Sequence, residues 1–194
     1  VAAMLLASRD IVGGIAFAQS QEATMSAQDM NALMEREKKR FAGAQLAGKT
    51  LGVVGLGAIG SLVARMGLDF GMDVVGFDPA LSVEAAWRLP SDVQRMEDVQ
   101  SFVSRSDFVS LHLPVLDSTR GLVNADMLSH FKQGSCLLNF AREEIVLIDA
   151  VVSALNSGQL RRYGTDFPHP QLLGRQDTLL MPHIGASTAE AEEN

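Results

Sequence analysis

The chain has 194 residues, a formal net charge of −7 and one cysteine, and 47% of its residues are apolar. This length and composition are typical of one globular domain and exclude a disordered chain. A single cysteine excludes a disulfide framework and a cysteine-rich zinc site, so we expect no metal. The acidic balance argues against partners such as nucleic acid or an anionic membrane, but a small anionic substrate needs only a local positive site.

The first part of the chain is apolar and then strongly polar. We predict one helix over Val1–Gln19, and we expect the chain to be a piece of a longer one because it starts without Met. The segment has no basic n-region, and Arg9-Asp10 interrupts its apolar run, which excludes a signal peptide and a transmembrane span. Residues 20–41 are polar, and the mixed charges at 35–40 predict a solvated surface.

From Thr50 onward, short apolar strands alternate with helices. We predict strands over residues 51–54, 73–77, 108–113, 135–140, 163–167 and 179–181, and helices over residues 59–70, 97–105, 125–132 and 149–155 and from Ser187 onward. This alternation indicates βαβ units and a parallel sheet with both faces covered by helices. We therefore treat residues 1–194 as a single α/β domain.

A glycine-rich loop lies between the first predicted strand and its helix. Residues 55–60 read Gly-Leu-Gly-Ala-Ile-Gly, and Asp78 follows eighteen residues after Gly60. The glycines permit a tight turn, close approach of a pyrophosphate and close helix–sheet packing, and the aspartate accepts hydrogen bonds from a ribose. The motif predicts a Rossmann-type, doubly wound sheet that binds a dinucleotide. With Pro79-Ala80 next and no arginine nearby, NAD is favoured over NADP.

Two simpler interpretations of this loop stay open. The glycines could form a turn in an α/β fold that binds no ligand, and Asp78 could be a turn residue before Pro79. Further polar residues follow later strands, at 139–142, 165–168 and 182–188, where open α/β sheets bind ligands. Oxidation of an alcohol needs a base and a cation that holds a carboxylate, and His183 and Arg142 could supply them.

Several motifs in order carry a family resemblance over nearly the whole chain. They are Gly-Lys-Thr-Leu-Gly-Val-Val-Gly-Leu-Gly at 48–57, His-Leu-Pro at 112–114 with Thr119, Asn-Phe-Ala-Arg at 139–142 and Pro-His-Ile-Gly-Ala-Ser-Thr at 182–188. The chain resembles the D-2-hydroxyacid dehydrogenase family, in which an NAD-binding domain is inserted into a substrate domain. The resemblance implies that residues 1–194 are this NAD-binding domain and that the substrate domain is absent from the chain.

The resemblance also implies roles for individual residues. Arg142 would bind the substrate carboxylate and carbonyl oxygen, His183 would be the acid/base, and Asp166 would lie near the nicotinamide carboxamide. The other expected cofactor-binding residues are Gly55, Gly57, Ala58, Ile59, Gly60, Asp78, Pro79, His112, Leu113, Pro114, Thr119, Phe140, Ala141 and Gly185, together with Arg142, Asp166 and His183. The alternatives are a surface ion pair for Arg142 and a structural role for His183 or His112.

The chain departs from the family pattern near these residues. Glu143 and Glu144 follow Arg142, and Leu147 stands where the family has an acid. The glutamate that usually pairs with the histidine about five residues after Asp166 is missing, and Gln171 stands in a shortened loop. Either another acid (Glu143, Glu144 or Glu190) reaches the site, or His183 works with a lower pKa, because Gln171 can orient the ring but cannot supply a charge. We favour the second alternative.

The resemblance implies oxidation of a D-2-hydroxy acid by NAD, with 3-phosphoglycerate as first choice and glycerate, lactate or glyoxylate types as alternatives. A non-catalytic, NAD-sensing module is another alternative, because the family contains corepressors. A cytoplasmic homodimer formed through the NAD-binding domain is expected. Met4-Leu5-Leu6 and Ile11-Val12 offer an apolar surface for that contact, unless this face packs on its own sheet.

Overall fold

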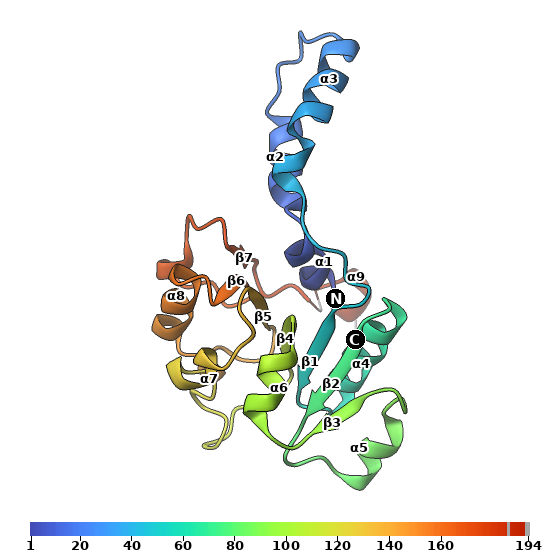
Figure 1. Ribbon diagram of the computed structural model, residues 1–194, viewed down its shortest axis with the longest axis vertical. Helices are drawn as coiled ribbons and strands as arrows, with labels where there is room; N and C mark the ends of the chain where they lie inside the picture. The colour runs from blue at the N-terminus through green and yellow to red at the C-terminus, as the bar shows by residue number, and fades with distance from the viewer. Residues whose placement is uncertain (186, 193–194) are drawn as a thin grey trace.

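The computed structural model describes residues 1–185 and 187–192, and a parallel sheet forms its centre (Figure 1). Within this part of the chain the sheet has seven strands in the order β3-β2-β1-β4-β5-β6-β7, which is the predicted doubly wound arrangement. The strands are β1 (Thr50–Val54), β2 (Asp73–Phe77), β3 (Gln94–Met96), β4 (Phe108–Leu111), β5 (Ser135–Asn139), β6 (Leu160–Thr165) and β7 (Thr178–Leu180).

Helices cover both faces of the sheet. They are α1 (Ala2–Ser8), α2 (Ile11–Gln19), α3 (Ala27–Glu37), α4 (Ala58–Asp69), α5 (Val83–Arg88), α6 (Val99–Arg105), α7 (Ala125–Ser129), α8 (Ile148–Asn156) and α9 (Ala189–Glu192), with short 3-10 turns η1 (Lys38–Phe41), η2 (Glu143–Ile145) and η3 (Pro170–Leu172). Successive strand side chains point to opposite faces. Val53 therefore packs with α1 and α4, whereas Val54 packs with α6, α7 and α8.

The predicted single helix at the start of the chain is wrong. Two helices form, because Asp10 ends the run and caps α2 by accepting a hydrogen bond from the Gly13 N–H at 3.2 Å. Helix α1 packs on β5, β6 and β7, and its last carbonyls accept hydrogen bonds from Arg161 and Arg162 on β6. Helices α2 and α3 form a hairpin that projects from the sheet (Figure 1).

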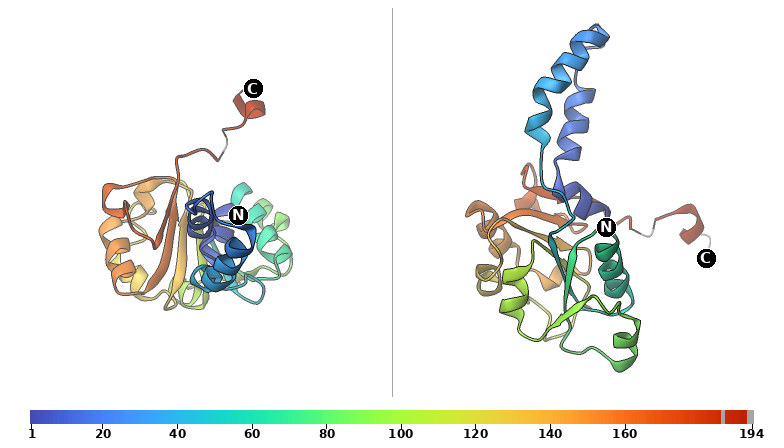
Figure 2. Two further views of the ribbon diagram at one scale, coloured as in Figure 1. Left: turned by 90° about the horizontal axis from the view of Figure 1, so that it is seen from above. Right: turned by 45° about the vertical axis from the view of Figure 1, so that its right-hand side comes forward.

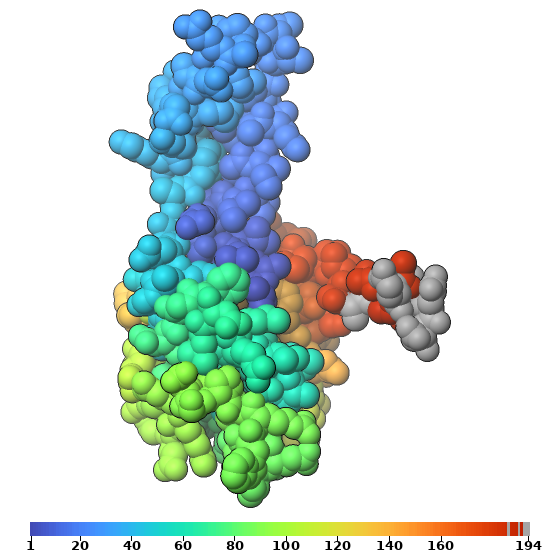
Figure 3. Space-filling view, turned by 90° about the vertical axis from the view of Figure 1, so that its right-hand side faces the viewer, coloured from blue at the N-terminus to red at the C-terminus, as the bar shows by residue number. Residues whose placement is uncertain are grey.

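The polar segment is exposed as predicted, but it is helical. Ser26 caps α3 by accepting a hydrogen bond from the Asp29 N–H at 3.1 Å, and no residue of α3 is buried. Helix α5 and strand β3 were not predicted, because both are short and neither has a buried residue. After β7 the chain leaves the sheet, and α9 lies apart from the body of the molecule (Figures 2 and 3). In the described residues, no helix combines the length and apolar character that a membrane crossing requires.

Helix α4 packs on the sheet with a different face from the one its apolar spacing suggested. Its buried residues are Gly60, Ala64 and Gly67, whereas Ile59, Leu62, Met66 and Phe70 are exposed. Small residues allow the helix backbone to lie close to β1 and β2, and a larger side chain would hold it away. This close approach fixes the position of the helix N-terminus at the edge of the sheet.

Candidate functional site

The expected site residues gather at the carboxyl ends of the parallel strands. The glycine loop follows β1, Asp78 follows β2, and His112 follows β4. On the other half of the sheet, Arg142 comes after β5, Asp166 comes directly after β6, and His183 comes after β7. Because β5, β6 and β7 are neighbours, the last three residues come from adjacent strand ends. Ligands bind at this edge in open α/β sheets.

The glycine loop has the geometry that a phosphate-binding turn needs. Gly55 has φ +87°, which favours glycine, and Gly57 is the N-cap of α4. A Cβ on Gly60 would lie 1.8 Å from the Gly55 carbonyl oxygen, so only glycine fits this crossing. A Cβ on Gly57 would meet nothing within 4 Å, which leaves the loop open on the side where a pyrophosphate would approach.

Asp78 holds the glycine loop and its own turn together. Its Oδ2 accepts a hydrogen bond from the Leu56 N–H at 2.8 Å, and its Oδ1 accepts one from the Ala80 N–H at 2.9 Å. The turn interpretation of Asp78 is therefore correct, but it does not exclude the ribose role. A carboxylate oxygen can accept more than one hydrogen bond.

A cleft of about 430 Å³ lies against the glycine loop. Phe77, Leu116 and Leu122 give it an apolar side that suits a planar base. Eight expected residues line it: Gly55, Gly57, Asp78, Pro79, His112, Leu113, Pro114 and Thr119. Leu116, Ser118 and Leu122 were not predicted, because the motif of this loop comprises only residues 112–114 and Thr119.

His112 and Thr119 shape the walls of this cleft. Burial lowers the pKa of His112 to about 4, so the ring is neutral at physiological pH, and its Nε2 lies 2.9 Å from the Ser110 hydroxyl. The Thr119 hydroxyl donates to the Pro114 carbonyl at 2.7 Å and accepts from the Leu116 N–H at 2.8 Å. Both side chains are thus partly engaged in holding the loop after β4.

Ala58, Ile59 and Gly60 form the first turn of α4 next to the cleft, and the Ile59 side chain is exposed. Phe140 and Ala141 follow β5. Ala141 is buried in one core cluster, and the partly buried Phe140 packs against the other. Gly185 lies beyond His183, and a Cβ on it would meet no atom of the described residues within 4 Å. Ala186, the next residue of that motif, lies outside the described residues.

A buried asparagine fixes the loop that carries Arg142. The Asn139 side chain accepts a hydrogen bond from the Ala141 N–H at 3.2 Å and donates one to the Arg142 carbonyl at 2.9 Å. The Arg142 side chain is exposed, and its Nη1 donates to the Ala141 carbonyl at 2.6 Å. Within residues 1–185 and 187–192, no carboxylate lies within 4 Å of its guanidinium. The cation is therefore free to bind an anionic group.

His183 has an acid partner that the sequence analysis did not foresee. Its Nδ1 lies 2.8 Å from Asp166 Oδ2, and the Phe167 ring lies 5.5 Å from the imidazole ring between centroids. The Asp166 side chain is 6% exposed, whereas that of His183 is 63% exposed. The other carboxylate oxygen, Oδ1, is buried and has no hydrogen-bond partner among the described residues.

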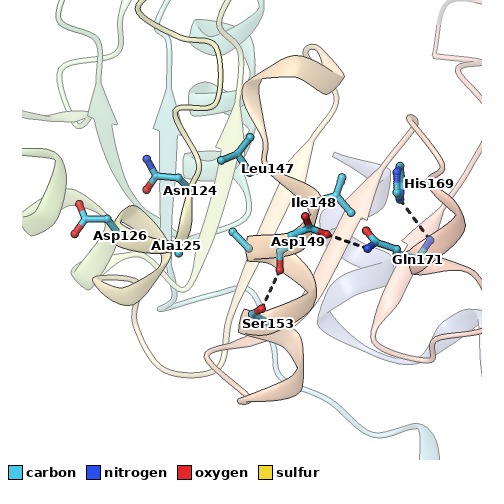
Figure 4. Close-up of a pocket in the computed structure, with 10 residues that line it drawn as sticks. Asn124, Ala125, Asp126, Leu147, Ile148, Asp149, Ser153, His169 and Gln171 are labelled. Atoms are coloured by element: carbon cyan, nitrogen blue, oxygen red, sulfur yellow. Dashed lines mark hydrogen bonds between the residues drawn. The ribbon is translucent and has the colours of Figure 1, made fainter.

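The expectation that Gln171 orients His183 is wrong. The Gln171 side chain donates instead to Asp149 Oδ1 at 2.9 Å, beside a groove of about 800 Å³ between α7 and α8 (Figure 4). Glu143 and Glu144 are exposed on η2 and form no ion pair with His183 in the described part of the chain. The side chain of Glu190 lies outside the described residues.

The residues at this edge fit a dinucleotide with a nicotinamide ring. Gly57 is open, the N–H groups of α4 point at the loop, and the buried Asp166 Oδ1 lacks a donor. A buried carboxylate oxygen without a partner is costly, and the amide group of a nicotinamide is a donor of the kind it lacks. The structure thus offers contacts for both ends of such a ligand.

Comparison with known sequences identifies one family. The model described as "D-isomer specific 2-hydroxyacid dehydrogenase, NAD binding domain" matches residues 1–185. D-3-phosphoglycerate dehydrogenase of Methanocaldococcus jannaschii is 34% identical over 82% of this chain and 31% of its own length. Hydroxypyruvate reductase of Thermotoga maritima is 36% identical over 80% of this chain and 52% of its own length. The chain thus spans about a third to a half of these curated relatives.

Solved structures show the same architecture. The holo form of D-mandelate dehydrogenase from Rhodotorula graminis superposes with a TM-score of 0.81 at 27% identity, over 98% of this chain and 55% of the other. A phosphoglycerate oxidoreductase from Vibrio cholerae gives a TM-score of 0.80 at 28% identity, over 98% of this chain and 59% of the other. The likeness therefore covers nearly all of this chain.

Proposed function

The chain belongs to the D-isomer specific 2-hydroxyacid dehydrogenase family as its NAD-binding domain, and we propose that the intact protein oxidises a D-2-hydroxy acid with NAD. One observation carries this proposal. Arg142, which has no acidic partner among the described residues, follows β5. The buried Asp166 and its partner His183 follow the next two strands, β6 and β7, at the edge where the dinucleotide loop also lies. Oxidation of a hydroxy acid requires a base that accepts the hydroxyl proton and a cation that binds the carboxylate, and these residues can supply both.

The chemistry follows from the protonation of His183. When its Nδ1–H donates to Asp166, the neutral ring leaves Nε2 without a proton, so Nε2 can take the proton of the substrate hydroxyl. Arg142 binds the substrate carboxylate and orients the hydroxyl-bearing carbon. NAD held at this edge by the glycine loop and Asp78 would supply the acceptor for the hydride that leaves this carbon. The imidazolium that forms on His183 lies beside the Asp166 carboxylate, which stabilises the positive charge.

The cofactor contacts are assigned to the first half of the sheet. We assign the pyrophosphate to the loop of Gly55, Gly57 and Gly60, and the ribose hydroxyls to Asp78. The cleft beside Pro79 and Leu113 would hold the base, and on the other half of the sheet Asp166 Oδ1 would be available to the nicotinamide amide. Residues 1–194 alone should bind NADH but turn over poorly, because a second domain is needed to exclude water from the site.

The first choice of substrate is 3-phosphoglycerate, which the intact protein would oxidise to 3-phosphohydroxypyruvate, the first step of serine biosynthesis. A relative named D-3-phosphoglycerate dehydrogenase supports it, and one named hydroxypyruvate reductase supports a glycerate-type acid as the alternative. A panel of 3-phosphoglycerate, D-glycerate, D-lactate and glycolate with NAD, followed by NADH absorbance, decides between them. No NADH from any member of the panel would contradict the proposal and favour a non-catalytic, NAD-sensing module.

We further propose that the protein is a homodimer that uses the projecting hairpin. Met4 is buried against its own sheet, which removes it from the expected contact, but Ile11, Val12 and Ile15 on α2 are exposed. Exposed apolar residues on a projecting element are typical of an interface. Light scattering of the intact protein and of Val12→Glu tests this, because a dimer predicts dissociation of the variant. The expected cytoplasmic location stays a prediction.

A further inference from the structure

We propose that Asp166 is the positioning residue of His183 and takes the place of the missing glutamate. The inference rests on the function proposed above and names a second duty for a residue expected only to contact the cofactor. One oxygen of the carboxylate, Oδ2, holds the catalytic histidine, and the other, Oδ1, stays free for the cofactor.

The backbone brings the two residues together. Strands β6 and β7 pair in parallel, with Thr165 opposite Leu180, and the Met181 N–H donates to the Thr165 carbonyl at 3.2 Å. The segment that carries His183 is therefore attached to the residue that immediately precedes Asp166. Thr165 is fully buried, and its hydroxyl accepts a hydrogen bond from the Phe167 N–H at 3.1 Å, which fixes the turn around Asp166.

The environment of the pair favours a strong interaction. The Asp166 side chain is 6% exposed, so the fold holds the carboxylate in place, and the Phe167 ring lies beside the imidazole with 5.5 Å between centroids. A hydrogen bond to a charged group is stronger than one between neutral groups. The exposed side of His183 is then left for the substrate. One ring nitrogen of His183 thus faces the carboxylate, while the exposed side of the ring can exchange a proton with the substrate.

This arrangement sets the tautomer of His183. Because Nδ1 lies 2.8 Å from the Asp166 carboxylate, we expect the neutral ring to carry its proton on Nδ1 and to present Nε2 as the base. Gln171 cannot perform this duty, because its amide is bound to Asp149 in the groove between α7 and α8 (Figure 4). Asp149 supplies a matched control, since it is an exposed acid with one amide partner and no contact with His183.

The test combines a spectroscopic and a kinetic measurement on the intact protein. ¹⁵N-labelled histidine NMR reports the tautomer, and His183 is assigned by the loss of its signals in His183→Asn. We expect the Nδ1–H tautomer in the wild type, altered His183 signals in Asp166→Asn, and unaltered ones in Asp149→Asn. At saturating NAD we expect Asp166→Asn to lower kcat about a hundredfold or more while KM for the hydroxy acid changes less than about threefold.

Two results would overturn the inference. One is an Nε2–H tautomer in the wild type, which can be seen even if Asp166→Asn fails to fold. The other is a folded Asp166→Asn protein that gives the same His183 signals as the wild type, or that keeps a kcat within about threefold of the wild-type value. The proposed function fails separately, if the wild type oxidises no hydroxy acid. In that case the NMR measurement still tests the inference, because the tautomer of His183 and its response to Asp166→Asn do not depend on turnover.

Discussion

Two alanine substitutions in the glycine loop should have sharply different effects. In Gly60→Ala the new Cβ would lie 1.8 Å from the Gly55 carbonyl oxygen and 2.9 Å from the Gly55 carbonyl carbon. Both neighbours are backbone atoms, so α4 must move away from β1. Overpacking of this kind costs about 1–3 kcal/mol, and the better helix propensity of alanine offsets up to about 1 kcal/mol. We expect a net loss of about 1–2 kcal/mol, together with weaker NADH binding.

Gly57→Ala is the matched control for stability. Its Cβ would meet no atom within 4 Å, and the φ of −67° suits alanine, so the free energy of unfolding should change by less than about 0.5 kcal/mol. The methyl group would stand where the pyrophosphate approaches, and we expect the NADH Kd to rise about a hundredfold.

Urea unfolding measures stability, and NADH fluorescence titration measures affinity. A Gly60→Ala protein as stable as the wild type would refute the packing argument. Tight NADH binding by Gly57→Ala would refute the assignment of the phosphates to this loop.

Two further predictions concern buried titratable groups. Burial lowers the pKa of His112 to about 4, so the unfolded chain binds a proton between about pH 6.5 and 4 that the folded chain does not. Stability should therefore fall as the pH falls through this window, by up to about 3 kcal/mol more in the wild type than in His112→Asn, as measured by urea unfolding at each pH. An equal fall in both proteins would contradict this. Burial also raises the pKa of the Cys136 thiol to about 11, so a thiol reagent at pH 8 should label the protein only in denaturant. Rapid labelling of the native protein would show that Cys136 is accessible.

Local sequence patterns were sufficient for much of the fold. The glycine loop, Asp78 and the buried strands were predictable because a turn, a helix start and an apolar run are each encoded in a few consecutive residues. The edge strand β3 and helix α5 lack such a signal, since both are short: β3 has three residues, two of them polar, and α5 has six, none of them buried. For α4 the apolar spacing indicated the wrong face, because close packing on the sheet selects Gly60, Ala64 and Gly67.

The partner of His183 was beyond the reach of these patterns. The Asp166–His183 contact depends on β6 lying beside β7 and on their register, and neither is encoded locally. The sequence analysis therefore considered acids near Arg142 and the nearby Gln171, but not an aspartate already given a cofactor role. A search for acids directly after each predicted strand would have included Asp166, since these positions share one edge of a parallel sheet.

The central claim is that this domain supplies the acid/base and the carboxylate-binding cation of an NAD-dependent D-2-hydroxy acid dehydrogenase. The most direct test is NADH production by the intact protein and its His183→Asn and Arg142→Ala variants, with NADH affinity measured on the same samples. We expect turnover to fall by at least about a hundredfold in both variants while the NADH Kd changes less than about threefold. Turnover at the wild-type rate in both variants would contradict the account.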